Sequence, residues 1–360
     1  MSVIAPSRFS TARRVARRAG LSGRRAKAEV PRLRTGPAHA SLTPTAWFIA
    51  PDWDKVAGGL RKQYRAVDVL NAAGLSAAIV HKRPGFACSW FDHETRIAAA
   101  ADVVVTPRDV IAVPEVYGTT ILDLPRGVNQ VILNQNAFNT FDLLASGGDA
   151  QAAPYVGNPD LAAVVVVSGH NAEALRYAFP GAPIHRWRHA IDPAVHHAPA
   201  TAAGRRIAFM PRRRAHEAAQ VLGLLERRGA LDGWEVVPIA GRTEAEAADI
   251  MRSSAIFLSF GELEGFGLPA LEALACECLV VGFDGFGGRG FFRSPFATRV
   301  EDGDVVGFAR AVEHVIGRFD YEPDAMRAAA ASGAAFVREH HSADAERRDL
   351  LDVFGPLLGA

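Results

Sequence analysis

Short apolar runs alternate with amphipathic stretches from Thr45 onwards, a pattern that predicts β-α-β units and parallel sheets. In the first half of the chain these runs predict strands at 47–50, 77–81, 103–106, 131–134 and 164–168. Between the first two, apolar residues recur at helical spacing over 60–70, and Gly74 is a candidate helix cap. These elements predict one Rossmann-like domain, which we place at 41–190.

A second series of the same kind follows a stretch without periodicity. Residues 184–203 mix proline with histidine and arginine, as expected of a crossover between domains. Beyond them, strands are predicted at 207–210, 236–240, 256–260 and 279–282, with helices at 216–227 and 244–251. We expect a second Rossmann-like domain at 203–335 and a C-terminal helix at 336–360 that could return to the first domain. The fold class is therefore α/β, with ligands expected in the cleft between the domains.

Charge separates the first 40 residues from this body. The chain has 360 residues, of which 49% are hydrophobic, and its formal net charge is +1. Residues 1–40 hold ten Lys and Arg against one acid, so the remaining body is acidic. We expect 1–40 to form a disordered, solvated tail; the alternative is an electrostatic tether to anionic lipid at the inner face of the membrane. An acidic body does not favour nonspecific binding of nucleic acid.

The apolar runs and the cysteines together indicate a cytoplasmic protein. The longest apolar run, 161–167, is far shorter than the roughly 20 residues that a membrane-spanning helix needs. Cys88, Cys276 and Cys278 are an odd number, and the spacing of the last two is not that of a zinc site. We expect all three to be reduced thiols in the core.

The most informative stretch is 259–276, which contains two glutamates eight positions apart. Glu264 follows a predicted strand, and Glu272 is expected in the first turn of a helix that begins at Pro269. Between the glutamates lie Gly265, Phe266, Gly267 and Leu268. Carboxylate oxygens accept hydrogen bonds from sugar and ribose hydroxyls, a helix N-terminus attracts phosphate, and glycine lets a ligand approach the backbone. Either glutamate alone would be an ordinary loop or helix residue, but the combination predicts a site for ribose, phosphate and sugar.

This stretch resembles the E-x7-E signature of retaining glycosyltransferases with the GT-B fold, in particular family 4 of the nucleotide-sugar-dependent enzymes. The similarity extends over about 47–337. Gly58 and Gly59, which open a predicted helix, resemble the glycine loop of the family's N-terminal domain. Ile191-Asp192 resembles the segment where the family crosses between domains, and Gly287-Gly288 resembles the loop after the motif.

The resemblance implies two Rossmann-like domains that face each other across a cleft, and the transfer of a sugar from a nucleotide-diphosphate donor to an acceptor hydroxyl with retention. It implies that Glu272 binds the ribose of the donor and Glu264 its sugar. Basic side chains and amides would hold the diphosphate, so neither a metal nor another cofactor is expected. A glycan or lipid-linked acceptor and a role in surface-glycan or polysaccharide synthesis are family-level expectations.

The sequence departs from the family pattern at three places. An Arg and Lys pair is replaced by Arg212-Arg213-Arg214; we expect Arg212 to bind the diphosphate, with Arg213 or Arg214 as substitutes, and a solvated basic turn is the alternative. A common histidine is replaced by Gln135-Asn136, where a hydrogen bond from either residue to the sugar and a structural turn are both open. The third departure is Gly290, which stands where many relatives have a glutamate.

Other candidate residues and other functions stay open. His185, His189, His196 and His197 lie in the crossover, where we expect solvated or interdomain histidines rather than metal ligands. Glu115 follows a predicted strand and is either a loop acid or a residue on the acceptor side. The alternative functions are a sugar-nucleotide epimerase or a phosphorylase of the same fold, and a noncatalytic binding protein. The donor nucleotide, the sugar, the acceptor and the oligomeric state are not determined by the sequence.

Overall fold

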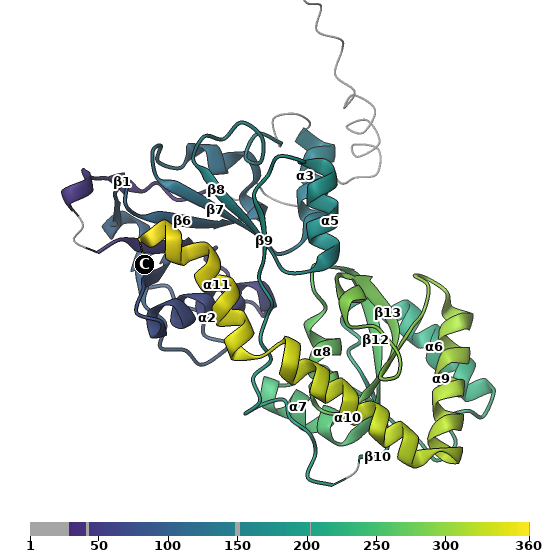
Figure 1. Cartoon of the computed structure of the whole chain (residues 1–360). Helices are drawn as coiled ribbons and strands as arrows, with labels where there is room; N and C mark the ends of the chain where they lie inside the picture. Colours follow the sequence, from purple (N-terminus) through teal and green to yellow (C-terminus); the bar gives the residue numbers. More distant parts are fainter. Residues whose placement is uncertain (1–28, 41–42, 148–151, 202, 360) are drawn as a thin grey trace, which may run out of the picture. The chain divides into compact units, whose positions relative to one another are not determined.

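The computed structural model describes residues 29–40, 43–147, 152–201 and 203–359 (Figure 1). The chain divides into two compact units. The first unit contains the described residues up to Val167 together with Asn171–Trp187 and the chain from Arg347 onwards, and the second contains Ser168–His170 and Arg188–Glu346. The expected tail at 1–28 lies outside the described residues.

The first unit is built on a seven-stranded parallel sheet with the order β4-β3-β2-β6-β7-β8-β9. Its strands are β2 (Thr45–Ile49), β3 (Ser76–His81), β4 (Ile97–Ala99), β6 (Val110–Pro114), β7 (Asn129–Asn134), β8 (Leu161–Val166) and β9 (Ile184–Arg186). Its helices include α2 (Gly58–Ala72), α3 (Ala137–Gly147), α5 (Gly169–Ala178) and most of α11 (Ala343–Leu358). The chain moves to β3 and β4 on one side of β2 and to β6 on the other, so the topological switch point lies between β2 and β6.

Helices cover both faces of this sheet because its strands are apolar on both faces. Successive strand residues point to opposite faces. On one face Ile49 packs in a cluster with Ala137 of α3 and Leu175 of α5. On the other, the ring of Phe48 lies 5.1 Å from that of Phe354 in α11, so the end of the chain completes the core of the first unit.

The second unit has a five-stranded parallel sheet with the order β11-β10-β12-β13-β14. Its strands are β10 (Gly204–Phe209), β11 (Glu235–Pro238), β12 (Ser254–Glu264), β13 (Leu279–Phe286) and β14 (Ala297–Arg299). Its helices are α6 (Ala215–Arg227), α7 (Glu244–Arg252), α8 (Leu268–Ala275), α9 (Val305–Tyr321) and α10 (Pro323–His340). Here the switch point lies between β10 and β12, which is where α/β sheets bind ligands.

The predicted elements are confirmed with adjustments at their ends. The strands β12 and β13 run four residues beyond the predicted ends, because their pairing resumes between Glu264 and Phe286 after an irregularity. The strand predicted at 103–106 is reduced to β5 (Val104–Val105). The segment expected to be one helix at 336–360 contains the end of α10 and then α11, with a break at His341.

The prediction of a disordered tail over all of 1–40 is wrong for its described part. β1 (Arg34–Thr35) pairs in parallel with β5, and Gly36 donates a backbone hydrogen bond to Val105. Val30 and Leu33 pack against the core of the first unit. Apolar side chains therefore anchor 29–36 in spite of the basic residues around them.

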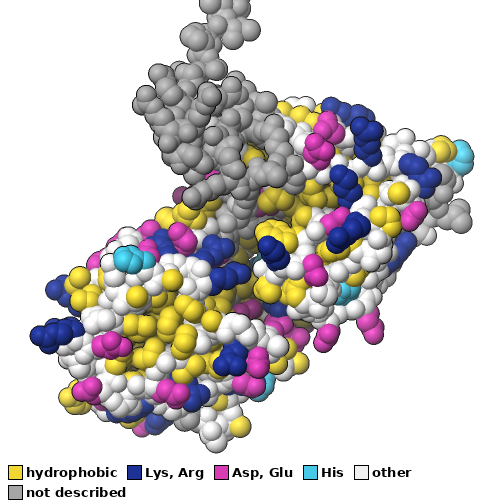
Figure 2. Space-filling view, turned by 180° about the vertical axis from the view of Figure 1, so that it is seen from behind, with side chains coloured by type: hydrophobic (Ala, Val, Ile, Leu, Met, Phe, Trp, Pro, Cys, Tyr) yellow, Lys and Arg dark blue, Asp and Glu magenta, His cyan; other side chains and the backbone are white. Residues whose placement is uncertain are grey.

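The surface charge and the hydropathy of the helices are those expected of the body of the chain. On the face shown in Figure 2, Lys and Arg side chains are interspersed with Asp and Glu. Among the described residues, no helix combines the length and the apolar character that crossing a membrane requires.

Candidate active site

Glu264 stands at the end of β12, beside the loop that follows β10. One carboxylate oxygen of Glu264 lies 3.3 Å from a guanidinium nitrogen of Arg213, and that same nitrogen donates to the backbone oxygen of Glu262 at 2.8 Å. Because β10 and β12 are neighbours at the switch point, the ion pair sits where a ligand of this unit is expected. The Glu264 side chain is 24% exposed and that of Arg213 is 40% exposed, so both are accessible to a ligand.

The surroundings of Glu264 hold its proton more tightly than water would. Burial raises the pKa of the Glu264 carboxyl, while the charges of Arg213 and Arg212 lower it and that of Glu262 raises it. Desolvation is the largest of these effects. A carboxylate in such a place is ready to accept hydrogen bonds that replace its lost hydration.

The three arginines after β10 have different surroundings. Arg212 is exposed, and Arg213 forms the ion pair with Glu264. Arg214 is only 9% exposed, with its guanidinium 2.7 Å from Asp302 and stacked 5.0 Å from the ring centroid of Phe283. Arg214 therefore has a structural place in the unit, and Arg212 and Arg213 remain as candidates for binding a diphosphate.

Glu272 lies one residue further into its helix than the sequence predicted. The helix α8 begins at Leu268, after the cap residue Gly267 with φ 92°, so Pro269 is the second helical residue rather than the first. Glu272 is the fifth, and the first turn contains no acid. The positive φ at the cap explains the shift, because glycine adopts that conformation without strain and lets the helix start one residue earlier.

A close approach between two loops fixes the backbone of the motif. A Cβ atom on Gly287 would lie 2.5 Å from the carbonyl of Gly265, and one on Gly285 would lie 2.8 Å from Cγ of Glu264. Phe266 is buried, with its ring 5.1 Å from that of His189 and 5.8 Å from that of Phe291. Phe266 thus anchors the loop, and the role of Gly285 beside Glu264 was not predicted from the sequence.

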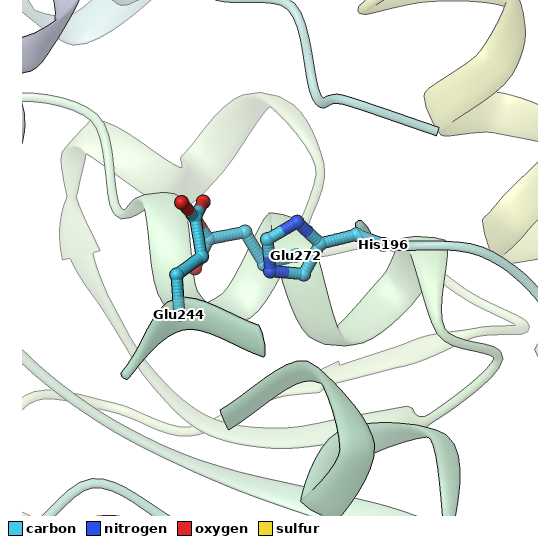
Figure 3. Close-up of side chains that lie close together, drawn as sticks. All are labelled: His196, Glu244 and Glu272. Carbon is cyan, nitrogen blue, oxygen red and sulfur yellow. The ribbon is translucent and has the colours of Figure 1, made fainter. Parts of the chain in front are cut away.

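Glu272 is grouped with two residues that sequence reasoning did not place at the site. Potential ligand atoms of His196, Glu244 and Glu272 all lie within 4.8 Å of one another. Figure 3 shows the side chains converging from the crossover segment, the start of α7 and the helix α8. A capping box of Thr243 and Glu246 fixes the first turn of α7, and the backbone N–H of His196 donates to Asp192 at 2.8 Å. Spacing along the chain gave no signal for this group because its members are far apart in sequence.

Two carboxylates and one imidazole can serve two kinds of ligand. The set has the chemistry of a site for a divalent cation. Its oxygens are equally suited to accept hydrogen bonds from the paired hydroxyls of a ribose. Since Glu272 belongs to both descriptions, a metal ion and a ribose would compete for it.

The candidates in the first unit gather at its own switch point. The amide of Gln135 donates to the backbone oxygen of Gly59 at 3.0 Å, and a Cβ on Gly59 would lie 1.9 Å from Oε1 of Gln135. Glu115, which is buried, accepts from the backbone N–H of Gln135 at 3.2 Å and from the amide of Asn139 at 2.8 Å. The loops after β2, β6 and β7 are therefore tied together, with Gly58 and Gly59 at the start of α2.

Asn136 has a structural contact at this edge. Its Oδ1 accepts a hydrogen bond from the backbone N–H of Phe138 at 3.0 Å, just where α3 begins at Ala137. Such a bond satisfies a free donor of the first helical turn. The turn that the sequence left open as an alternative is thus present.

Comparison with known sequences gives a partial match. No family model matches the chain. An alpha-1,6-glucosyltransferase of Actinobacillus pleuropneumoniae is 28% identical over 193 residues, which are 51% of this chain and 56% of that protein. The chain thus spans little more than half the length of this curated relative.

Among solved structures, sucrose-phosphate synthase from Thermosynechococcus elongatus has a TM-score of 0.65 and 14% identity, covering 88% of this chain and 99% of that one. HepE from Anabaena, in complex with UDP and glucose, has a TM-score of 0.62 and 12% identity, covering 87% and 100%. The chain therefore has the GT-B fold with two Rossmann-like domains, as the sequence predicted.

Proposed function

We propose that this chain is a glycosyltransferase that moves a sugar from a nucleotide-diphosphate donor to an acceptor hydroxyl with retention, in the manner of family 4. The observation that carries the proposal is the pair of glutamates in the second unit. Glu264 is ion-paired with Arg213 at the switch point, and Glu272 follows in the helix that begins at the same edge of the sheet. The glucosyltransferase relative and the neighbour that binds UDP and glucose support it.

The roles follow from the surroundings of each residue. The carboxylate of Glu264 would accept hydrogen bonds from the donor sugar, and Arg213, with Arg212 beside it, would stabilise negative charge on the departing diphosphate. Glu272, with His196 and Glu244, would accept hydrogen bonds from the ribose. Orientation and electrostatic stabilisation would then supply most of the rate. The leaving phosphate itself would take the proton of the acceptor, so no protein base is required.

We further propose that transfer needs no metal ion. The arginines after β10 supply the positive charge that a metal would otherwise bring to the diphosphate. A cation bound by His196, Glu244 and Glu272 would displace the ribose, so it would inhibit the reaction. Activity should therefore persist in EDTA and fall when Zn²⁺ is added.

The first test is thermal stabilisation by nucleotide sugars, since a ligand of the native state raises stability by about 2.7 kcal/mol at a hundredfold excess over Kd. We expect one class among UDP-, GDP-, ADP- and dTDP-sugars to raise the Tm in EDTA. Glu272→Ala should lose this shift, whereas Glu277→Ala, which alters a glutamate just past the end of α8, should keep it. A chain that no nucleotide sugar stabilises would contradict the proposed function.

A further inference from the structure

Loop 82–89 follows β3 in the first unit and is held at both ends by side chains. The carboxylate of Asp52 accepts backbone hydrogen bonds from Lys82 at 3.0 Å and Arg83 at 2.9 Å. At the other end, the hydroxyl of Tyr64 accepts from the backbone N–H of Cys88 at 3.3 Å. Asp54 accepts from the backbone N–H of Ser89 at 2.9 Å and from its hydroxyl at 2.8 Å. The loop is therefore fixed in one conformation at the carboxyl end of the sheet.

A buried imidazole connects the two ends. Nδ1 of His81 lies 3.2 Å from Asp52, and Nε2 lies 2.6 Å from the hydroxyl of Tyr64. Burial lowers the pKa of His81, which favours the neutral ring that donates to Asp52 and accepts from Tyr64. Both His81 and Tyr64 are fully buried. A buried polar network in which the groups are hydrogen-bonded to one another makes the structure around it rigid. This network therefore holds the loop in place.

The loop presents two exposed cations, and the nearby carboxylates of Asp52 and Asp54 accept hydrogen bonds from its backbone. Lys82 and Arg83 are exposed, and within the part of the chain that the structure describes neither lies within 4.0 Å of an acidic oxygen. The guanidinium of Arg83 lies 4.5 Å from the ring centroid of Phe86, an arrangement that orients its planar donors.

A cavity of about 240 Å³ opens beside Arg83. It is lined by Arg83, Gly85, Phe86, Ala87 and the strand β4. Its volume is below the roughly 300–1,000 Å³ of pockets that enclose drug-sized ligands, so it suits one phosphate or one sugar ring. Arg83 is the one charged residue in its lining, so a single anionic group fits the cavity best.

We propose that loop 82–89 is a phosphate-binding subsite for the acceptor, in which Arg83 binds a phosphate ester and Lys82 adds positive charge. The acceptor role rests on the proposed function, whereas the phosphate site rests on the loop alone. A guanidinium matches the geometry of phosphate with two parallel hydrogen bonds. The phosphate could belong to a soluble sugar phosphate or to a lipid headgroup.

Calorimetric titration with glucose 6-phosphate tests the soluble source, and sedimentation with phosphatidylglycerol vesicles against phosphatidylcholine vesicles tests the lipid source. We expect one of these probes to bind, and Arg83→Ala to weaken it by about tenfold or more, the size of a charge-assisted hydrogen bond. Arg126→Ala is the matched control, because this arginine is 61% exposed and precedes β7 at the opposite end of the same sheet. It should bind the probe as the unaltered chain does.

A second comparison separates this subsite from the donor site, which would also attract phosphate. Arg213→Ala should keep the binding of the probe that Arg83→Ala loses. Loss of binding in Arg213→Ala instead of Arg83→Ala, or binding of neither probe, would overturn the proposal. Stabilisation by nucleotide sugars is measured without these probes, so its absence would contradict the proposed function while leaving the phosphate site standing.

Discussion

At the scale of single residues, the second unit distinguishes two glutamates that look alike in sequence. Glu264 is partly buried and paired with Arg213, whereas Glu272 is grouped with His196 and Glu244. The two carboxylates are therefore expected to serve different parts of one ligand, and they should respond differently to substitution.

Replacement of Glu264 by Gln should slow turnover without loss of the nucleotide. The amide keeps the size of the side chain but has only one acceptor oxygen and no charge, so transition-state contacts to the sugar are lost. We expect kcat to fall by about a hundredfold or more, and the thermal shift by the nucleotide to remain. Glu277→Gln, which alters a glutamate just past the end of α8, is the control. Full activity in Glu264→Gln would show that this carboxylate has no role in transfer.

The charge of Arg213 should influence the pH range in which Glu264 is ionised and the enzyme is active. Burial raises the pKa of Glu264, and the charge of Arg213 opposes that rise. Removal of the charge in Arg213→Ala raises the pKa further, so a larger share of Glu264 is protonated at a given acidic pH. Because the ionised form accepts the hydrogen bonds, the acid limb of kcat/KM should move to higher pH. A limb that stays in place or moves to lower pH would contradict this assignment.

At the scale of elements, the ends of β12 and β13 depend on each other through glycine. The chain after β13 packs so closely on Gly265 that only a residue without Cβ fits at Gly287. The same contact positions the start of α8, and with it the loop between the two glutamates. The motif is therefore supported by residues that follow it in the sequence.

A comparison of two neighbouring glycines tests this dependence. In Gly287→Ala the new methyl group would lie 2.5 Å from the backbone of Gly265, so either that loop moves or the unit is strained. We expect a loss of about 1–3 kcal/mol in the free energy of unfolding, typical of overpacking, together with weaker binding of the donor. In Gly290→Ala the Cβ has no neighbour within 4 Å, and both quantities should stay unchanged. Equal behaviour of the two variants, measured by urea unfolding, would argue against the loop contact.

At the scale of the whole molecule, the first unit is discontinuous in sequence. Its sheet is formed by the first half of the chain, but α11 supplies part of its core from the last residues. The ring of Phe354 is fully buried against Phe48 in the inner strand β2. The core of the first unit therefore includes a helix that lies far from its sheet in the sequence.

Phe354→Ala should therefore destabilise the first unit, far away in sequence. Removal of a buried phenylalanine typically costs about 3–5 kcal/mol through lost burial and the cavity that remains. Tyr177→Ala provides the control, since that aromatic ring is in the same unit but its residue is 92% exposed, and the variant should be nearly neutral. Chemical unfolding followed by circular dichroism measures both. A loss below about 1 kcal/mol for Phe354→Ala would mean that α11 adds little to this core.

The sequence determined much of the fold because its patterns are local. Continuous apolar runs such as 131–134 are typical of strands in a parallel sheet that is covered by helices on both faces. Apolar residues at helical spacing over 60–70 indicate an amphipathic helix. The spacing of Glu264 and Glu272 around two glycines is likewise evident from the sequence alone. Errors arose where a local pattern competes with a distant partner, as at Val30 and Leu33, whose apolar contacts outweigh a basic environment.

Only the tertiary structure decided which residues surround the motif. The pairing of Glu264 with Arg213 depends on β10 and β12 being neighbours at the switch point, and the group of His196, Glu244 and Glu272 brings together three segments that no spacing relates. The clamp of Asp52, His81 and Tyr64 on loop 82–89 has the same origin. Periodicity and helix caps reflect interactions between residues a few positions apart, whereas a site is built from contacts across strands, and these contacts exist only once the chain has folded.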